Sequence, residues 1–126
     1  MIQNGYQAAY KQQSLLTMTQ GEMLSAVYDG LLKALYSAQK AFKINDITLI
    51  NKHLLKAQEI LRYLKSTLNS QYEVSQNLDT LYDYFIEQIR QANIKKSPDG
   101  LDDITQMIQE LRDAFVQADK NVRLQK

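Results

Sequence analysis

The chain has 126 residues, of which 44% are apolar and 23% are charged, and 15 basic against 14 acidic residues give it a net charge of +1. This length suits one domain with a single core. The composition is that of a folded protein, so a disordered chain is not expected. The small net charge argues against a nucleic-acid partner, and the lack of cysteine excludes disulfides, thiolate metal sites and cysteine nucleophiles.

The sequence also lacks the patterns that direct a chain into a membrane. The first 13 residues contain no basic start followed by an apolar stretch, so no secretory signal is predicted. No run approaches the roughly 20 apolar residues that span a bilayer. We therefore expect a soluble cytoplasmic protein with no membrane insertion.

Residues 1–18 are predicted to form a mobile or short-helical N-terminal arm, ahead of a helical bundle domain over residues 19–126. The arm is mainly polar, but Tyr6, Ala9 and Tyr10 share one helical face. Two interpretations stay open. The arm is either a frayed terminus or a segment that docks on the body of the protein, since exposed apolar groups often mark a contact surface.

Two amphipathic helices are predicted next. The first opens at Thr19, and Glu22 follows three residues later, as in a capping box. Gly30 lies inside this helix, where glycine costs about 1 kcal/mol relative to alanine, so we expect a close helix crossing there. Asn45 and Asp46 then interrupt the pattern and offer capping oxygens to the second helix. The apolar positions of the second helix repeat at three and four, as in a bundle: Ile47, Ile50, Leu54, Ala57, Leu61, Leu64 and Leu68.

The second helix carries more apolar surface than one such line requires. Ile60 and Tyr63 fall on a neighbouring line of the same helix. Either two other helices pack against it, or part of its surface stays open to a partner.

The third helix is predicted over residues 77–94 and has three different faces. One face is core-forming, with apolar residues spaced at three and four: Leu78, Leu81, Phe85, Ile89 and Ala92. A second strip is mixed and could receive a partner: Tyr82, Ile86 and Asn93. The third carries carboxylates, and we interpret it as a solvated stripe in which Arg90 pairs with Glu87: Asp79, Asp83 and Glu87.

The last helix is predicted to start near a turn, with Ser97 as its N-cap and Pro98 at its first position. Its apolar line is the most regular in the chain: Leu101, Ile104, Ile108, Leu111, Phe115, Ala118 and Val122. Four helices of similar length joined by short breaks, with no strand signal, predict an all-α fold, an antiparallel up-down four-helix bundle.

The sequence offers little for catalysis, cofactors or metals. His53 is the only histidine, so the paired Glu-x-x-His motifs of di-iron bundles cannot be assembled. No glycine-rich phosphate loop or nucleophile elbow is present. We therefore expect a binding protein that is not an enzyme, with no cofactor and no metal site.

Three segments of the chain carry short motifs. The first, residues 9–35, includes Tyr10, Thr17, Leu24, Tyr28 and Gly30. The third helix carries Leu-Tyr-x-Tyr and Ala-Asn elements, with Asn77, Leu78, Leu81, Tyr82, Tyr84, Ala92 and Asn93. Residues 111–115 read LRDAF. Together these segments resemble the flagellar secretion chaperone family, in its opening, its third helix and its Leu-Arg-x-Ala-Trp element. The chain departs from the family pattern at Gln13, Gln20 and Phe115, where asparagine, proline and tryptophan are usual.

The resemblance implies a cytoplasmic export chaperone that binds the disordered C-terminal segment of flagellin. Binding would prevent premature polymerisation and keep the client competent for type III export. Components of the flagellar export gate are candidate further partners, and homodimerisation stays open. The alternative is a helical interaction or homodimerising bundle from an unrelated pathway.

The hypothesis for the site places a client groove on the second and third helices. In it Asn93 would hydrogen-bond the client backbone, and Tyr10 on the arm would cover the groove when it is empty. The predicted partner-binding residues are Tyr10, Ile60, Tyr63, Tyr82, Ile86, Ile89 and Asn93.

Overall fold

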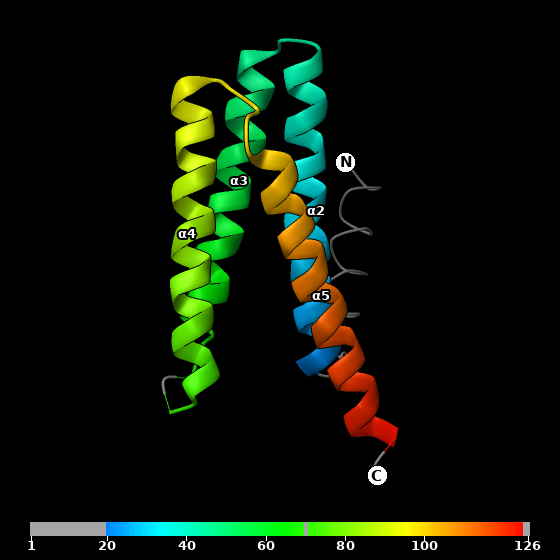
Figure 1. Ribbon diagram of the computed structural model, residues 1–126. Helices are drawn as coiled ribbons and strands as arrows, with labels where there is room; N and C mark the ends of the chain where they lie inside the picture. The colour runs from blue at the N-terminus through cyan, green and yellow to red at the C-terminus, as the bar shows by residue number, and fades with distance from the viewer. Residues whose placement is uncertain (1–19, 70, 125–126) are drawn as a thin grey trace, which may run out of the picture.

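Four helices make up the part of the chain that the computed structural model describes, residues 20–69 and 71–124. They are α2 (Gln20–Lys43), α3 (Ile47–Ser66), α4 (Glu73–Lys95) and α5 (Leu101–Leu124). Successive helices run in opposite directions (Figure 1), so the predicted all-α antiparallel bundle is confirmed. The predicted arm and the Thr19 cap lie outside the described residues.

The helices are arranged in the order α4, α3, α2, α5. The α3 helix packs against both α2 and α4, and α2 also packs against α5, whereas α4 and α5 have few contacts. Figure 1 shows α4 and α5 diverging away from the loop that joins them. The bundle is therefore closed along three helix pairs and open along the fourth.

The core lies where α2 and α3 meet their outer neighbours. Its fully buried side chains come from all four helices and include Leu35, Leu54, Phe85 and Ile108. Burial of one such side chain contributes about 1.5–3 kcal/mol, so the apolar lines predicted from the sequence are what hold the helices together.

The α2–α3 turn follows the predicted capping chemistry. Asn45 takes a left-handed backbone with φ 55°, and this turns the chain out of α2. The side chain of Asp46 then accepts a hydrogen bond from the backbone N–H of Leu49 at 3.1 Å, as an N-cap does. The predicted cap at Asp46 is confirmed.

The α4–α5 connection differs from its prediction. The chain leaves α4 through Lys96, which has φ 49°, and Gly100 has φ 84°. Because this turn takes up residues 96–100, α5 starts at Leu101, and the predicted N-cap at Ser97 with Pro98 as first helical residue is wrong. The hydroxyl oxygen of Ser97 instead accepts a hydrogen bond from the N–H of Asp99 at 3.3 Å. At its other end α4 starts at Glu73, four residues before the predicted 77.

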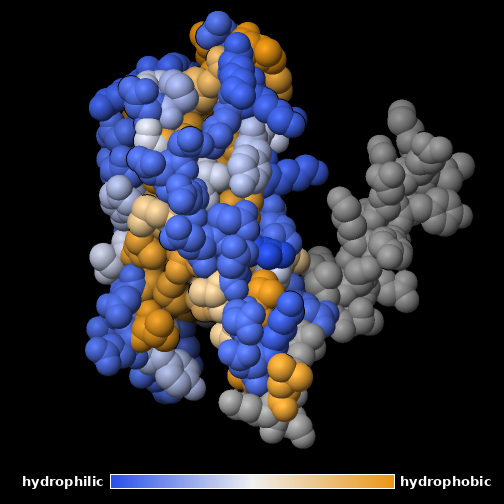
Figure 2. Space-filling view, turned by 45° about the vertical axis from the view of Figure 1, so that its right-hand side comes forward, coloured by the Kyte–Doolittle hydropathy of each residue, from blue (hydrophilic) through white to orange (hydrophobic). Residues whose placement is uncertain are grey.

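The apolar line of α5 is covered only in its first half. Leu101, Ile104 and Ile108 are buried, whereas Phe115 is half-buried and Val122 is 55% exposed. The cause is the divergence of α4, which leaves the later turns of α5 without a neighbour on that side. Apolar surface accordingly lines the opening between the two diverging ends (Figure 2).

Over residues 20–69 and 71–124, no helix has both the length and the apolar content that crossing a bilayer requires.

Candidate partner-binding surface

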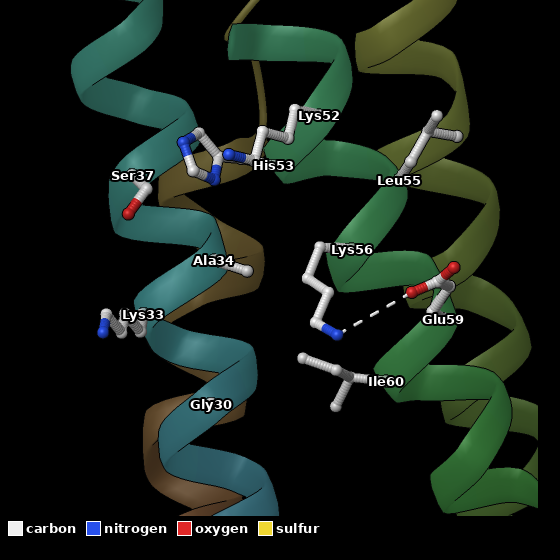
Figure 3. Close-up of a pocket in the computed structure, with 10 residues that line it drawn as sticks. All are labelled: Gly30, Lys33, Ala34, Ser37, Lys52, His53, Leu55, Lys56, Glu59 and Ile60. Carbon is white, nitrogen blue, oxygen red and sulfur yellow. Dashed lines mark ion pairs between the residues drawn. The ribbon is translucent and has the colours of Figure 1, made fainter. Parts of the chain in front are cut away.

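A groove follows the line along which α2 and α3 meet. Its upper part has a volume of about 820 Å³ and lies between Gly30, Lys33 and Ser37 on α2 and residues of α3 (Figure 3). His53, Lys56 and Ile60 extend from α3 toward α2 across this space. The arrangement is that of an open surface depression, with helix walls and side chains from α3 reaching over it.

The groove continues toward the start of α2. A second depression shares Gly30 and Ile60 with the first and adds Val27 and Tyr63. A third shares Val27 and Tyr63 with the second and ends at Gln20 and Thr67. Because successive depressions share residues, they form one continuous channel, which we call the α2–α3 groove.

Gly30 lies on the floor of the α2–α3 groove and makes no close helix crossing. A Cβ atom added at this residue would meet only the Cδ1 atom of Ile60, at 3.9 Å. The close crossing predicted from the sequence is therefore wrong. The absent side chain deepens the groove instead.

The walls of the groove expose apolar groups. Tyr63 is 51% exposed and Leu55 is 46% exposed, while Ile60 is half-buried against the core. Covering apolar surface contributes about 25 cal/mol per Å², so these groups could supply binding energy to an apolar partner. Two of the predicted partner-binding residues, Ile60 and Tyr63, lie together here.

The rim of the groove is basic. Lys33 stands on the α2 side, Lys52 and Lys56 stand on the α3 side, and Glu59 is the acidic group among the lining residues. The amino group of Lys56 lies 3.9 Å from the Glu59 carboxylate, and both side chains are mostly exposed. Such an exposed pair contributes little, so Lys56 stays available to a partner.

Ile86 lies on the other side of α3, away from the groove. It lines a depression between α3 and α4 with Arg62, Lys65 and Asp83. Lys65 forms ion pairs with Asp83 and with Asp79 at 3.5 Å, which raises the pKa of its amino group, chiefly through the hydrogen bond to Asp83. The predicted residues that line surface depressions, Ile60, Tyr63 and Ile86, thus occupy two surfaces and not one.

The carboxylates of the α4 stripe have basic partners: Asp79 and Asp83 pair with Lys65 of α3, and Glu87 pairs with Arg90. Glu87 accepts hydrogen bonds from Arg90 at 2.8 Å, as predicted, and from Gln91 at 3.0 Å. These bonds, first of all the one from Arg90, lower the pKa of the Glu87 carboxyl to about 2. Within the described ranges, no group of three or more potential metal-ligating side chains could hold an ion.

Tyr82 and Ile89 lie in the core. Their exposed fractions are 2% and 0%, so their side chains are covered by the protein's own helices in this structure. The Tyr82 hydroxyl is hydrogen-bonded to that of Tyr28 on α2. Burial raises the pKa of both hydroxyls above the ordinary tyrosine value.

Asn93 is also largely enclosed, and both ends of its amide have partners. Its NH₂ group donates to the side-chain oxygen of Asn51 on α3 at 2.9 Å, and its own oxygen accepts from the Lys96 amino group at 2.5 Å. The bond to Asn51 joins the end of α4 to α3. Tyr10, the remaining predicted residue, lies outside the described residues.

The sequence reasoning missed the basic rim and the role of Gly30. Lys52 and Lys56 are four residues apart, a spacing that places them on one helical face and that could have signalled the α3 rim. No pattern in the sequence pairs that face with Lys33 of α2, because the pairing depends on how the two helices pack.

Comparison with known proteins gives consistent matches over most of the chain. Residues 2–122 match the model of the family described as "Flagellar protein FliS". The chain is 38% identical over 122 residues to the flagellar secretion chaperone FliS of Bacillus subtilis, covering 97% of this chain and 91% of that one. It is 34% identical over 90 residues to the protein of the same name from Vibrio cholerae, covering 70% and 66%. The Escherichia coli chaperone of this name is 26% identical over 105 residues, covering 81% and 77%.

Proposed function

Because the chain belongs to the FliS family of flagellar proteins, we propose that this flagellar export chaperone binds the C-terminal segment of flagellin along the α2–α3 groove. The client is disordered alone and forms helix where it lies on the bundle. Its apolar face is then covered, so it cannot pair with other subunits, and it remains unfolded enough for type III export. The binding takes place in the cytoplasm and includes no catalytic step.

The observation that carries this proposal is the apolar wall of the groove. Ile60 and Tyr63 stand on an open channel that follows most of α2, a shape that suits a helix laid in a groove. Ile86 belongs to α4 and lines the depression on the side of α3 that faces away from the groove. There it would contact a later part of a client that wraps around the bundle. Tyr82, Ile89 and Asn93 stay predicted contacts of that client, although the chain covers them here.

Binding through the apolar walls of the groove is compatible with later release of the client. Part of the contact energy is consumed in ordering the client, so a groove with apolar walls need not hold it irreversibly. Delivery to components of the export gate then requires only that a competing contact replace part of the groove contact. Homodimerisation is not needed for any step of this function.

Calorimetry with the host's flagellin C-terminal segment tests the proposal. We expect Ile60→Asp to weaken binding by at least tenfold, since it places a charge on the apolar wall. Ile94→Asp is the matched control, because Ile94 is 63% exposed on α4 and does not line the groove, and we expect it to bind like the wild type.

Ile60 is half-buried, so a variant that leaves the core untouched is needed beside it. Tyr63→Ser serves this purpose because Tyr63 is 51% exposed. Wild-type affinity in folded Ile60→Asp and Tyr63→Ser, checked by circular dichroism, would remove the groove from the client site. No binding by the wild type would refute the flagellin proposal itself.

A further inference from the structure

The α2–α3 groove has basic side chains on both of its edges. Lys33 stands on the α2 edge, and Lys52 and Lys56 stand one turn apart on the α3 edge (Figure 3). Within residues 20–69 and 71–124, neither Lys33 nor Lys52 forms an ion pair. The groove is therefore more cationic than the whole chain, whose net charge is only +1.

The floor between these edges is open at Gly30. A methyl group there would have only the Cδ1 atom of Ile60 within 4 Å, at 3.9 Å, so the fold does not require the glycine for packing. A ligand lying in the groove could approach the α2 backbone closely at this point. From Gly30 toward the start of α2, the groove has apolar walls, which are formed by Val27, Ile60 and Tyr63.

We propose that the groove selects an amphipathic helix with carboxylates along both flanks of its apolar face. Its apolar face lies over Gly30 and Ile60, and its Asp or Glu side chains meet Lys33 on one edge and Lys52 and Lys56 on the other. This inference rests on the proposed function and adds to it the sequence character of the client segment that the groove accepts.

The dimensions of the groove suit such a helix. It extends along α2 from Gln20 to Ser37, which at 1.5 Å per residue corresponds to about 25 Å. A helix of about 18 residues has that length, enough for apolar anchors on four or five successive turns.

Two other occupants match the charges less well. Residues 1–19 of this chain contain Lys11 and no aspartate or glutamate, so the arm could cover the apolar walls but could not pair with the lysines. A second copy that presented the same groove would bring lysines against lysines, which is repulsive. A separate acidic helix is the occupant that satisfies both the walls and the edges.

Two designed peptides of about 18 residues test the charge selection by fluorescence anisotropy at low ionic strength. Both have the same Leu and Ala face, and they differ only at the flanking positions, which are Glu in one and Gln in the other. We expect the Glu peptide to bind the full chain about tenfold more tightly, with the difference shrinking as salt is added. Equal affinities would overturn the proposal.

A lysine variant locates the effect. In Lys33→Gln/Lys52→Gln/Lys56→Gln, we expect the Glu peptide to lose its advantage while the Gln peptide binds as before. The control Lys43→Gln/Lys95→Gln/Lys120→Gln removes the same total charge at exposed lysines outside the groove and should keep the preference. An equal loss in both variants would show a general charge effect and would refute the specific role of the rim.

A glycine variant tests the open floor. Gly30→Leu adds a side chain where the structure has space, and leucine is a good helix former, so we expect an unchanged or higher Tm. Affinity for the Glu peptide should fall at least tenfold because the floor is filled. Ala114→Leu, at an exposed site on α5, is the control and should bind normally. Normal binding by Gly30→Leu would overturn this part of the proposal.

The host's flagellin C-terminal segment separates this inference from the proposed function. If the wild type binds that segment and the rim variant binds it equally well, the acidic-helix inference fails and the chaperone proposal stands. If the wild type does not bind the segment but still prefers the Glu peptide in a rim-dependent way, the inference about the groove stands and the flagellin proposal fails.

Discussion

The hydroxyl groups of Tyr28 on α2 and Tyr82 on α4 are hydrogen-bonded to each other inside the bundle. Both side chains are almost fully buried, and the Tyr28 ring also lies 5.7 Å from the ring of Phe115 on α5. The pair, with the Phe115 contact, therefore links α2, α4 and α5. Neither hydroxyl reaches water, so each depends on the other as its partner.

A double-mutant cycle on this pair should show strong coupling. Tyr28→Phe and Tyr82→Phe each leave one buried hydroxyl without its partner, which costs about 1–3 kcal/mol of unfolding free energy. The double variant removes both hydroxyls, and two apolar rings of similar shape pack in their place. Its loss of unfolding free energy should therefore be much smaller than the sum of the losses in the two single variants. Urea denaturation measures the three values. Strictly additive losses would show that the two hydroxyls do not interact.

The same pair should make stability fall in alkaline solution. Burial raises the pKa of both hydroxyls, while an unfolded tyrosine ionises near 10. Above about pH 10 the unfolded chain therefore binds fewer protons than the folded chain, and stability decreases as pH rises, by up to about 1.4 kcal/mol per pH unit for each hydroxyl. Below about pH 10 the contribution of the two hydroxyls to the unfolding free energy does not change with pH.

Denaturation curves between neutral pH and pH 11 check this expectation. The Tyr28→Phe/Tyr82→Phe variant keeps every lysine and every exposed tyrosine, so its stability should fall less steeply with pH than that of the wild type. Parallel curves for the two proteins would contradict the assignment of the alkaline loss to this pair.

Two glycines of α2 should respond differently to alanine. At Gly30 a Cβ has free space, so Gly30→Ala should raise the unfolding free energy by about 0.5–1 kcal/mol through helix propensity. At Gly21 the new Cβ would clash with a carboxylate oxygen of Asp119 on α5. That carboxylate would have to leave the first turn of α2, where a negative charge is favourable, which offsets the propensity gain. Thermal denaturation compares the two, and an equal gain at both positions would be inconsistent with the contact at Gly21.

The fold was predictable because its main signal is local. Apolar spacing along Ile50, Leu54 and Leu61 identifies the buried face of α3, and Asp46 marks where the helix begins. The apolar line of α5 has the same spacing and extends to Val122, but Val122 is exposed. Periodicity shows which face of a helix is apolar, but the angle between helices decides how far along that face a neighbour reaches, and no local pattern encodes that angle.

The candidate site was predictable only in part for a related reason. The sequence pattern indicates Ile60 and Tyr63 as surplus apolar groups on α3, and both line the groove. The sequence pattern places Tyr82 in a partner-facing strip because it adjoins the core face of α4. In the structure its hydroxyl is instead hydrogen-bonded inside the bundle to Tyr28, which is 54 residues away in the chain. Contacts of this kind can be inferred only once the helices have been placed against one another.

The N-terminal arm provides the last prediction. Residues 1–17 carry apolar groups, including Tyr10, but no carboxylate, and the sequence prediction is that this arm covers the groove when it is empty. Deleting residues 1–17 keeps Thr19 ahead of α2 and should leave affinity for the flagellin segment equal or up to about tenfold higher, because a weak internal competitor is removed. Tyr10→Ser in the full chain should shift the affinity in the same direction by a smaller factor. Calorimetry measures both, and a large loss of affinity in the deletion variant would mean that the arm holds the client directly.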